Sequence, residues 1–340
     1  MEPTNSRFQI LSLSGGGYRG LYTAAVLAAI EKHSKQPIGT CFEIIAGTSI
    51  GGIIALAAAF EVEMAKVLKI FQEAGSSIFP ARPGGSFLRK CRNLIADFRR
   101  PLYSTEPLRK VIEDLIGKNV KLGDAKHPLL IPTVNLTQGT PQVFKTHHHP
   151  NFIRDWQFDV VDVALATSAA PVFFPPAGLA NSLYADGGLV ANSPDLVAVH
   201  EATHFLRIPR DRVWMVSIGT TTSKYSVPDV PGNAYGARFW ITDHEHRLPN
   251  ILISAQQQFA QQITEHLLED RYLRIDTVPS HEQAPHLGLN VVTTTATAIL
   301  CALGEKAGTD ALGKQYIQDI LRHRAVDILL SKEGRDGQSF

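Results

Sequence analysis

Short apolar runs alternate with glycine-rich turns and apolar helical segments in the first sixty residues. Residues 8–13 are typical of a β-strand, glycines follow, and residues 21–30 have the alanine and leucine content of a buried helix. The same order recurs at once, with a strand predicted over 42–46, a sharp turn over 47–49 and an apolar helix over 50–60. Strands joined by helical crossovers indicate an α/β fold with a parallel sheet, in which the two turns lie side by side.

The same patterns continue along the chain. Further strands are predicted over 129–136, 141–147, 182–185 and 213–219, and further helices over 104–116, 159–166, 188–206, 251–268 and 311–330. We expect one domain over 1–340, with a three-layer α/β core over about 8–219. Residues 220–340 would form a cap or helical extension, and are a candidate regulatory region.

The amino-acid composition excludes several classes of protein. The 340 residues are 44% hydrophobic and 19% charged, which is typical of a globular chain and excludes disorder and fibrous repeats. The 33 basic and 32 acidic residues nearly cancel, so no DNA or RNA partner is expected. Three widely spaced cysteines argue against a disulfide framework and favour the cytoplasm.

The sequence also predicts no membrane-spanning segment. The N-terminus has no signal-peptide pattern, and the longest uncharged run, 44–60, is 17 residues long, short of the roughly 20 that a span needs. Residues 75–103 carry six basic residues and one acidic residue. This segment is interpreted as a solvated insertion or as a docking surface for lipid headgroups or a phosphorylated ligand.

Two known binding motifs occur without the further residues that their ligands require. Gly15, Gly17 and Gly20 satisfy the GxGxxG pattern of dinucleotide-binding turns, but the next strand ends in glycine, threonine and serine rather than the acidic residue that would bind a ribose. His200 and His204 match the zinc motif HExxH, but no third ligand is evident downstream. We therefore expect no cofactor and no metal.

The segment GTSIG at residues 47–51 satisfies the GxSxG pattern of serine hydrolases. A strand before it and an apolar helix after it place Ser49 on a tight turn, with its hydroxyl exposed at a helix N-terminus. If the first two strands are adjacent and parallel, the backbone N–H groups of Gly15, Gly16 and Gly17 lie close to Ser49 and can form an oxyanion hole. Arg19 adds positive charge to this site.

Three motifs, taken in their order along the chain, resemble those of a known protein family. GGGYRG at 15–20, GTSIG at 47–51 and DGG at 186–188, together with ATSAAPVFFPP at 166–176, resemble the patatin-like phospholipase family. The resemblance covers about 8–219 and implies a lipid acyl hydrolase with a Ser–Asp dyad, in which Ser49 is the nucleophile and Asp186 the base.

A dyad of this kind needs a special environment. An ordinary aspartate, with a pKa near 3.9, is a weak base for a serine hydroxyl. We therefore expect Asp186 to be partly buried, because burial raises the pKa of a carboxyl group.

The region after residue 219 differs from the motifs shared across that family. Aromatic residues and arginines between 220 and 250 could stack on a base and bind phosphate; the candidates are Tyr225, Tyr235, Arg238, Trp240 and Arg247. An ordered cap over the lipid cleft is the alternative for this segment.

The whole chain is also similar to the phospholipase effectors of bacterial anti-phage CBASS systems. That resemblance implies an enzyme activated by a cyclic dinucleotide such as cGAMP, acting from the cytoplasm at the inner membrane, with self-association on activation as a further possibility. The alternatives are an unregulated lysophospholipase or esterase, and a cyclic-nucleotide sensor that acts through a protein partner.

Overall fold

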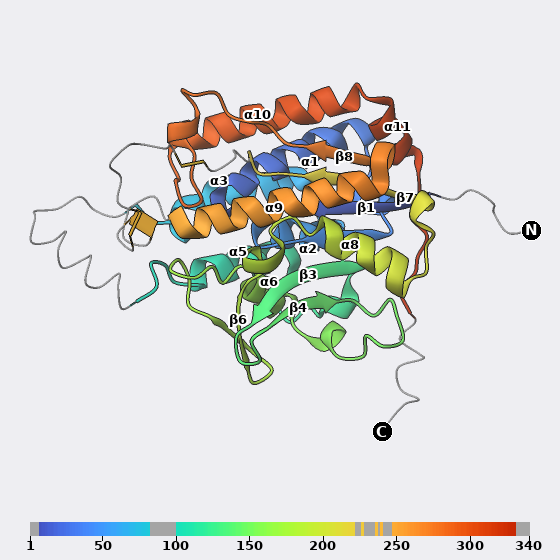
Figure 1. Cartoon of the computed structure of the whole chain (residues 1–340), viewed down its shortest axis with the longest axis horizontal. Helices are drawn as coiled ribbons and strands as arrows, with labels where there is room; N and C mark the ends of the chain where they lie inside the picture. Colours follow the sequence, from blue (N-terminus) through green and yellow to red (C-terminus); the bar gives the residue numbers. More distant parts are fainter. Residues whose placement is uncertain are drawn as a thin grey trace, which may run out of the picture.

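An eight-stranded sheet forms the centre of the computed structural model, which describes residues 7–81, 100–221, 226–227, 235–236, 239–240 and 247–330 (Figure 1). Its strands are β1 (Phe8–Leu13), β2 (Ile44–Gly47), β3 (Leu129–Asn135), β4 (Thr140–Lys145), β5 (Ala177–Leu179), β6 (Ser182–Asp186), β7 (Val213–Ile218) and β8 (Tyr272–Ile275). The order across the sheet is β5-β6-β3-β2-β1-β7-β8, with β4 also paired to β3. The run from β3 to β8 is parallel, and β4, β5 and β6 add antiparallel pairs.

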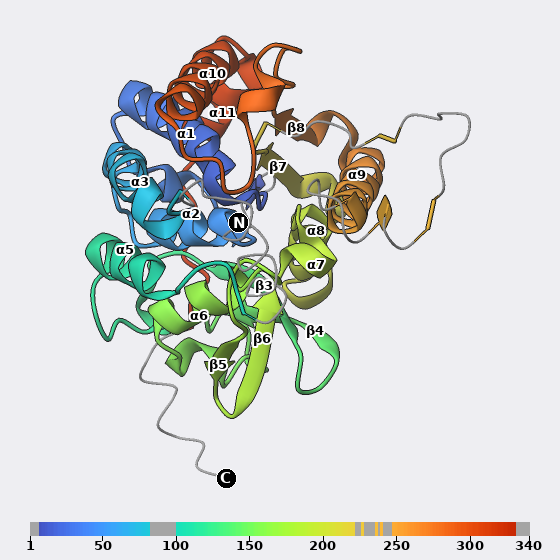
Figure 2. The ribbon, with the colours of Figure 1, turned by 90° about the vertical axis from the view of Figure 1, so that its left-hand side faces the viewer.

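Alternating side chains of the strands build two apolar layers. Leu11 and Leu13 of β1 belong to one buried cluster, whereas Phe8 and Ile10 belong to the other, because successive side chains point to opposite faces of a sheet. The first cluster is covered by α1 (Gly20–Ser34), α2 (Ile50–Ala59), α3 (Met64–Ile78), α5 (Glu106–Ile116) and α6 (Val160–Thr167). The other face carries α7 (Gly188–Ala191), α8 (Asp195–His200) and α9 (Arg247–Leu268) (Figure 2). The expected three-layer α/β fold with a mainly parallel sheet is confirmed.

The first two strands meet as the sequence predicts. β1 and β2 are adjacent and parallel, with Leu13 paired to Gly47, so their carboxyl ends share one edge of the sheet. The turns that follow these strands are therefore neighbours in space.

The region after residue 219 differs from the prediction in two places. It contributes a strand, β8, at the sheet edge, which the helical pattern did not indicate. It also contains α10 (Thr294–Leu312), which was not predicted and packs along α1. Gly304 and Gly308 make that contact, and a Cβ atom at Gly304 would lie 2.5 Å from the Tyr22 carbonyl oxygen. A helix that packs through glycine and alanine has no stripe of large apolar residues to reveal it.

The expected helix over 311–330 is wrong in its extent. A short helix, α11 (Gln315–Arg322), is present, and residues 323–330 are not helical. The basic segment 75–103 is only partly described. Its first four residues belong to α3, which ends at Ile78. Residues 82–99, with five of its six basic side chains, lie outside the described residues. No helix in the described part of the chain is both long and apolar enough to cross a bilayer.

The turn after β1 approaches α2 closely enough to require glycine. A Cβ atom on Gly51 would lie 2.4 Å from the carbonyl oxygen of Leu13 and 2.6 Å from that of Ser14. Both contacts are to backbone atoms, which cannot turn away as a side chain can. The second residue of α2 must therefore be glycine if the helix is to lie this close to the end of β1.

We predict that Gly51→Ala lowers the free energy of unfolding by about 1–3 kcal/mol, the usual cost of overpacking, although alanine is the better helix former. Chemical denaturation measures the change. Gly178→Ala is the control, because a Cβ atom there meets nothing within 4 Å. Equal stability of the two variants would show that the contact at Gly51 is not restrictive.

Candidate active site

Ser49 occupies a strained turn between β2 and α2. Its backbone has φ 55° and ψ −126°, in the left-handed half of conformational space that residues with a side chain seldom adopt. A Cβ atom at Gly47 would lie 2.2 Å from the Gly51 carbonyl oxygen, so the glycines on both sides of the serine are needed for a turn this tight. The turn is held by the Ser49 N–H, which donates to Thr167 Oγ1 at 3.1 Å.

Asp186 lies at the end of β6 and accepts a hydrogen bond from Ser49. The Ser49 hydroxyl donates to Asp186 Oδ2 at 2.7 Å, and the Gly188 N–H donates to Oδ1 at 2.6 Å. The Asp186 side chain is 6% exposed. Burial raises the pKa of Asp186 from 3.8 to about 6, while the hydrogen bonds from Gly188 and Ser49 act in the opposite direction. Near neutral pH the carboxylate is therefore ionised, yet more basic than an ordinary aspartate.

The glycine loop lies beside this pair. A Cβ atom on Gly15 would lie 3.3 Å from the Ser49 Cβ, and the Gly15 N–H donates to the Asn192 carbonyl oxygen at 2.9 Å. That bond leaves Gly15 without a free donor, so its expected part in an oxyanion hole is reduced to allowing close approach. Within the described residues no acceptor is found for the N–H groups of Gly16 and Gly17. These two amides are available to bind an anion.

Two neighbours shape the glycine loop. A Cβ atom at Gly16 would lie 2.3 Å from Thr220 Oγ1, and Gly17 has φ +56° and faces the Leu289 carbonyl oxygen. Arg19 lines the same cavity, and its backbone N–H donates to the Gly16 carbonyl at 3.2 Å. Burial lowers the pKa of Arg19 against the attraction of Asp276, but a guanidinium stays charged at neutral pH. It supplies positive charge and no transferable proton.

Ser49 and Asp186 open into a cavity of about 870 Å³. Besides these polar groups the lining is largely apolar, with Phe71, Ile78, Phe79, Leu108, Phe173 and Phe174 among its residues. A cavity with a few convergent polar groups and long apolar walls suits a substrate that carries an ester on a hydrocarbon chain.

The expected nucleotide-binding residues are only partly described. Tyr225 and Arg238 lie outside the described residues. The other three candidates surround Phe239: the ring centroids of Tyr235 and Trp240 lie 5.1 Å and 5.2 Å from it, and the Arg247 guanidinium lies 4.3 Å from its centroid. Tyr235 is 46% exposed. These side chains form an aromatic and cationic cluster at the start of α9.

The glutamate of the HExxH motif is engaged in an ion pair. Glu201 is buried, and its carboxylate accepts hydrogen bonds from Lys145 Nζ at 2.5 Å and from His148 Nε2 at 3.0 Å. The rings of His200 and His204 stack with centroids 4.9 Å apart on the exposed side of this helix. Glu201 is therefore engaged in a buried ion pair, whereas His200 and His204 are exposed to solvent.

Several residues that hold the site escaped sequence reasoning. Asn192, Thr167 and Thr220 contact the reactive groups or the glycine loop through hydrogen bonds. Thr167 lies within the ATSAAPVFFPP segment and Asn192 lies four residues after DGG, so the family motifs pointed to the segments that contain these two residues. Thr220 and Leu289 lie after the shared motifs, and no sequence pattern pointed to them.

A strained serine, a buried carboxylate within hydrogen-bonding distance and a glycine loop on an α/β sheet define a serine acyl hydrolase. The chain belongs to the patatin-like phospholipase family, whose model matches residues 11–199. It is 37% identical over 320 residues to a protein named cGAMP-activated phospholipase from Pseudomonas aeruginosa, covering 94% of this chain and 93% of that protein. A protein of the same name from Vibrio cholerae is 34% identical over 332 residues, covering 92% and 94% of the two chains.

The pKa of Asp186 makes a prediction about pH. If the ionised carboxylate accepts the Ser49 proton, kcat/KM for a soluble short-chain ester should rise about tenfold per pH unit below pH 6 and level off above it. A profile measured from pH 3.5 to 8 tests this, and a midpoint near pH 4 would contradict the effect of burial.

Stability provides an independent check on the same group. Because burial raises the pKa of Asp186 in the folded protein, ionising this carboxyl group opposes folding. The stability that its protonated form contributes at low pH is therefore lost as the pH rises through about 6. Asp186→Asn should therefore be more stable than the wild type by up to about 3 kcal/mol at pH 8 and have little effect at pH 4. Denaturation at both pH values measures the difference.

Proposed function

We propose that this protein hydrolyses acyl esters of membrane phospholipids, with Ser49 as nucleophile and Asp186 as base, and that a cyclic dinucleotide activates it. One observation carries the chemical part: the hydrogen bond of 2.7 Å from Ser49 Oγ to a buried carboxylate, both of which line a large and mainly apolar cavity. The nucleophile and its base are already in contact, as general-base catalysis requires.

The reaction follows from this geometry. Ser49 Oγ attacks the ester carbonyl carbon while its proton passes to Asp186, and the N–H groups of Gly16 and Gly17 bind the oxyanion that forms. Collapse of the tetrahedral intermediate expels the lysophospholipid alkoxide, which takes the proton from Asp186. Water then attacks the acyl-serine, gives its proton to Asp186, and the fatty acid leaves as Ser49 regains a proton.

Activation by cGAMP is proposed from the relatives. Two proteins whose names state this activation match the chain over more than nine tenths of its length, including the part beyond the family model. We assign the base-stacking surface to the cluster around Phe239, with Tyr235, Trp240 and Arg247, and include Tyr225 and Arg238 from the sequence. The resemblance to CBASS effectors supports a role in defence against phage, in which activated enzyme degrades the cell's own membrane.

Fatty-acid release from phospholipid vesicles tests both the hydrolytic activity and its activation by a cyclic dinucleotide. We expect release by the wild type to depend on cGAMP, and Ser49→Ala and Asp186→Asn each to reduce it by about a thousandfold or more. Trp240→Ala should raise the cGAMP concentration needed for half-maximal activity about tenfold, because a stacked base contributes about 1–3 kcal/mol. Ser280→Ala, in an exposed loop, is the control.

The outcomes separate the alternatives. Release that is equal with and without any cyclic dinucleotide would indicate an unregulated esterase or lysophospholipase. Binding of cGAMP with no hydrolysis of vesicles or soluble esters would instead indicate a sensor that acts through a protein partner. Full activity of Asp186→Asn would overturn the role of the base.

Contact with the membrane is proposed for one face of α9. Residues 248–264 contain no charged side chain, and Leu248, Leu252 and Phe259 lie on one side of the helix, 40%, 60% and 64% exposed. Pro249 and Ile253 of the same helix line the cavity, as do the exposed Val172 and Leu189. An exposed apolar surface that continues into the cavity provides a route for a lipid to leave a bilayer. We propose that it contacts the inner membrane from the cytoplasm.

We predict that the double variant Leu252→Ser, Phe259→Ser lowers vesicle binding about tenfold, because less apolar surface enters the lipid. Hydrolysis of a soluble short-chain ester should be unchanged. Co-sedimentation with vesicles measures binding, and Ile153→Ser, which is equally exposed elsewhere, is the control.

Unchanged vesicle binding would place the membrane contact elsewhere, with the basic segment 75–103 as the next candidate. A change in the oligomeric mass of the double variant, with vesicle binding intact, would show instead that this face joins copies of the chain.

A further inference from the structure

Arg274 lies behind the glycine loop on β8, beyond the residues that the family model matches. The strand pairs with β7 so that Arg274 is opposite Ser217. Only 16% of the arginine side chain is exposed. Arg274 is not among the cavity-lining residues in the part of the chain that the structure describes, so its side chain does not border the cavity.

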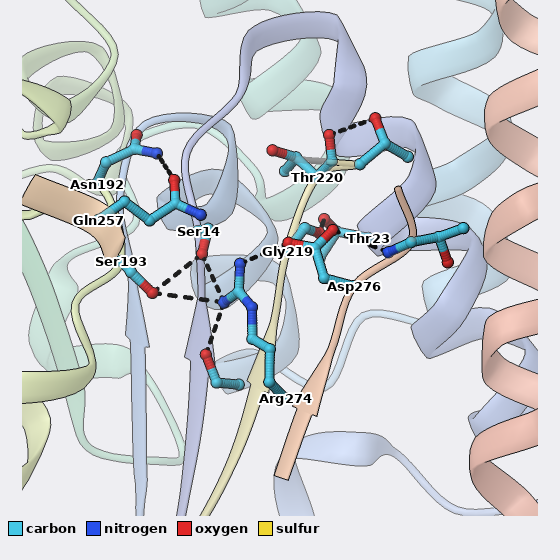
Figure 3. Close-up of polar contacts among 12 residues, drawn as sticks. Ser14, Thr23, Asn192, Ser193, Gly219, Thr220, Gln257, Arg274 and Asp276 are labelled. Carbon is cyan, nitrogen blue, oxygen red and sulfur yellow. Dashed lines mark hydrogen bonds and ion pairs between the residues drawn. The ribbon is translucent and has the colours of Figure 1, made fainter. Parts of the chain in front are cut away.

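One nitrogen of this arginine joins three segments. Arg274 Nη1 donates to Ser217 Oγ at 2.7 Å, to Ser14 Oγ at 2.9 Å and, at the longer distance of 3.4 Å, to Ser193 Oγ (Figure 3). Ser217 belongs to β7, Ser14 follows β1, and Ser193 lies between α7 and α8. The guanidinium therefore fixes the relative position of segments that are far apart in the sequence.

Two of these serines are direct neighbours of residues at the site. Ser14 precedes Gly15, and Ser193 follows Asn192. Gly15 and Asn192 are joined twice, by the Gly15 N–H to the Asn192 carbonyl at 2.9 Å and by Asn192 Nδ2 to the Gly15 carbonyl at 3.3 Å. Displacing Ser14 would move this joint, and with it the amides of Gly16 and Gly17.

The charge of Arg274 is compensated on both sides. Nη2 donates to Asp276 Oδ2 at 2.8 Å. On the other side Asp195 accepts from Ser217 at 2.9 Å and from the Tyr272 hydroxyl at 2.8 Å, so its charge lies one serine away from the arginine. Held between two buried or half-buried carboxylates, the guanidinium has little freedom to rotate, and its fork geometry can reach both an acid and the serines.

We propose that Arg274 is a positioning residue for the oxyanion-binding loop: it holds Ser14 and Ser193 so that the joint between Gly15 and Asn192 keeps the Gly16 and Gly17 amides directed at the substrate. The inference rests on the proposed function of that loop. Small displacements of an oxyanion donor reduce catalysis strongly, because the donor must meet the charge that develops in the transition state. The segment that follows the shared family core thereby completes the catalytic site.

A double-mutant cycle between Arg274→Lys and Ser14→Ala tests the proposal. Lysine keeps the charge that Asp195 and Asp276 require, but one ammonium group cannot span Asp276 and the serines. On a soluble short-chain ester, each variant should lower kcat about tenfold and change KM less than twofold, and the double variant should be no worse than the poorer single one. The midpoint of the pH profile should stay near pH 6, because the contact between Ser49 and Asp186 is untouched.

Arg271→Lys is the matched control, since Arg271 is similarly buried three residues earlier and contacts Asp270 instead of the loop. It should retain wild-type kcat. Melting temperatures of all variants, with rates measured well below them, separate loss of fold from loss of catalysis. Ser193→Ala provides a milder change if Arg274→Lys does not fold, and a smaller fall in kcat without a change in KM is expected for it.

Wild-type kcat in both Arg274→Lys and Ser14→Ala would overturn the proposal, and so would losses that simply multiply in the double variant. Ser49→Ala distinguishes this failure from failure of the proposed function. If Ser49→Ala is inactive while Arg274→Lys resembles the wild type, only the role of Arg274 is wrong. If Ser49→Ala remains active, the proposed chemistry itself fails.

Discussion

The structure depends on the close approach of two neighbouring backbone turns. β1 and β2 end side by side, and α2 begins so near the end of β1 that only a hydrogen atom fits at Gly51. The same constraint forces Ser49 into a left-handed conformation and brings its side chain toward the glycine loop. Backbone strain is stored at the point where the hydroxyl must project from the turn, and the packed apolar layers on both sides of the sheet maintain it.

Burial gives the Asp186 carboxyl group a pKa in the range that is usual for histidine. In water an aspartate is too weak a base for a serine hydroxyl, but desolvation brings its pKa to about 6, within the range in which histidine works. The Gly188 N–H limits this rise by stabilising the anion. The balance leaves a base that is charged at neutral pH and gains a proton readily. Burying that charge costs stability, so the site is kept for a purpose other than folding.

Much of this site could be predicted from the sequence because its determinants are local. The glycines of GGGYRG and GTSIG specify turns, and the apolar runs before them specify parallel strands, so the meeting of Ser49 with the glycine loop followed from pattern alone. Asp186 required a family resemblance, since a DGG turn by itself is ordinary. Long-range contacts could not be predicted from local pattern: the Gly15 N–H is occupied by the carbonyl of Asn192, which lies 177 residues further along the chain. The helix α10 was missed because glycine and alanine, rather than large apolar residues, form its contact with α1.

The residues that hold the glycine loop come late in the chain. Ser49, Asp186 and the loop itself precede residue 190, but Arg274 contacts Ser14, and the Leu289 carbonyl accepts a hydrogen bond from the Tyr18 N–H within the GGGYRG turn. Ser49, Asp186 and the glycine loop are therefore synthesised before the residues that hold the loop in place. A polypeptide translated only as far as Asp186 already contains the Ser49–Asp186 pair but lacks these later contacts, so the glycine loop can reach its final position only after residue 289 has been made.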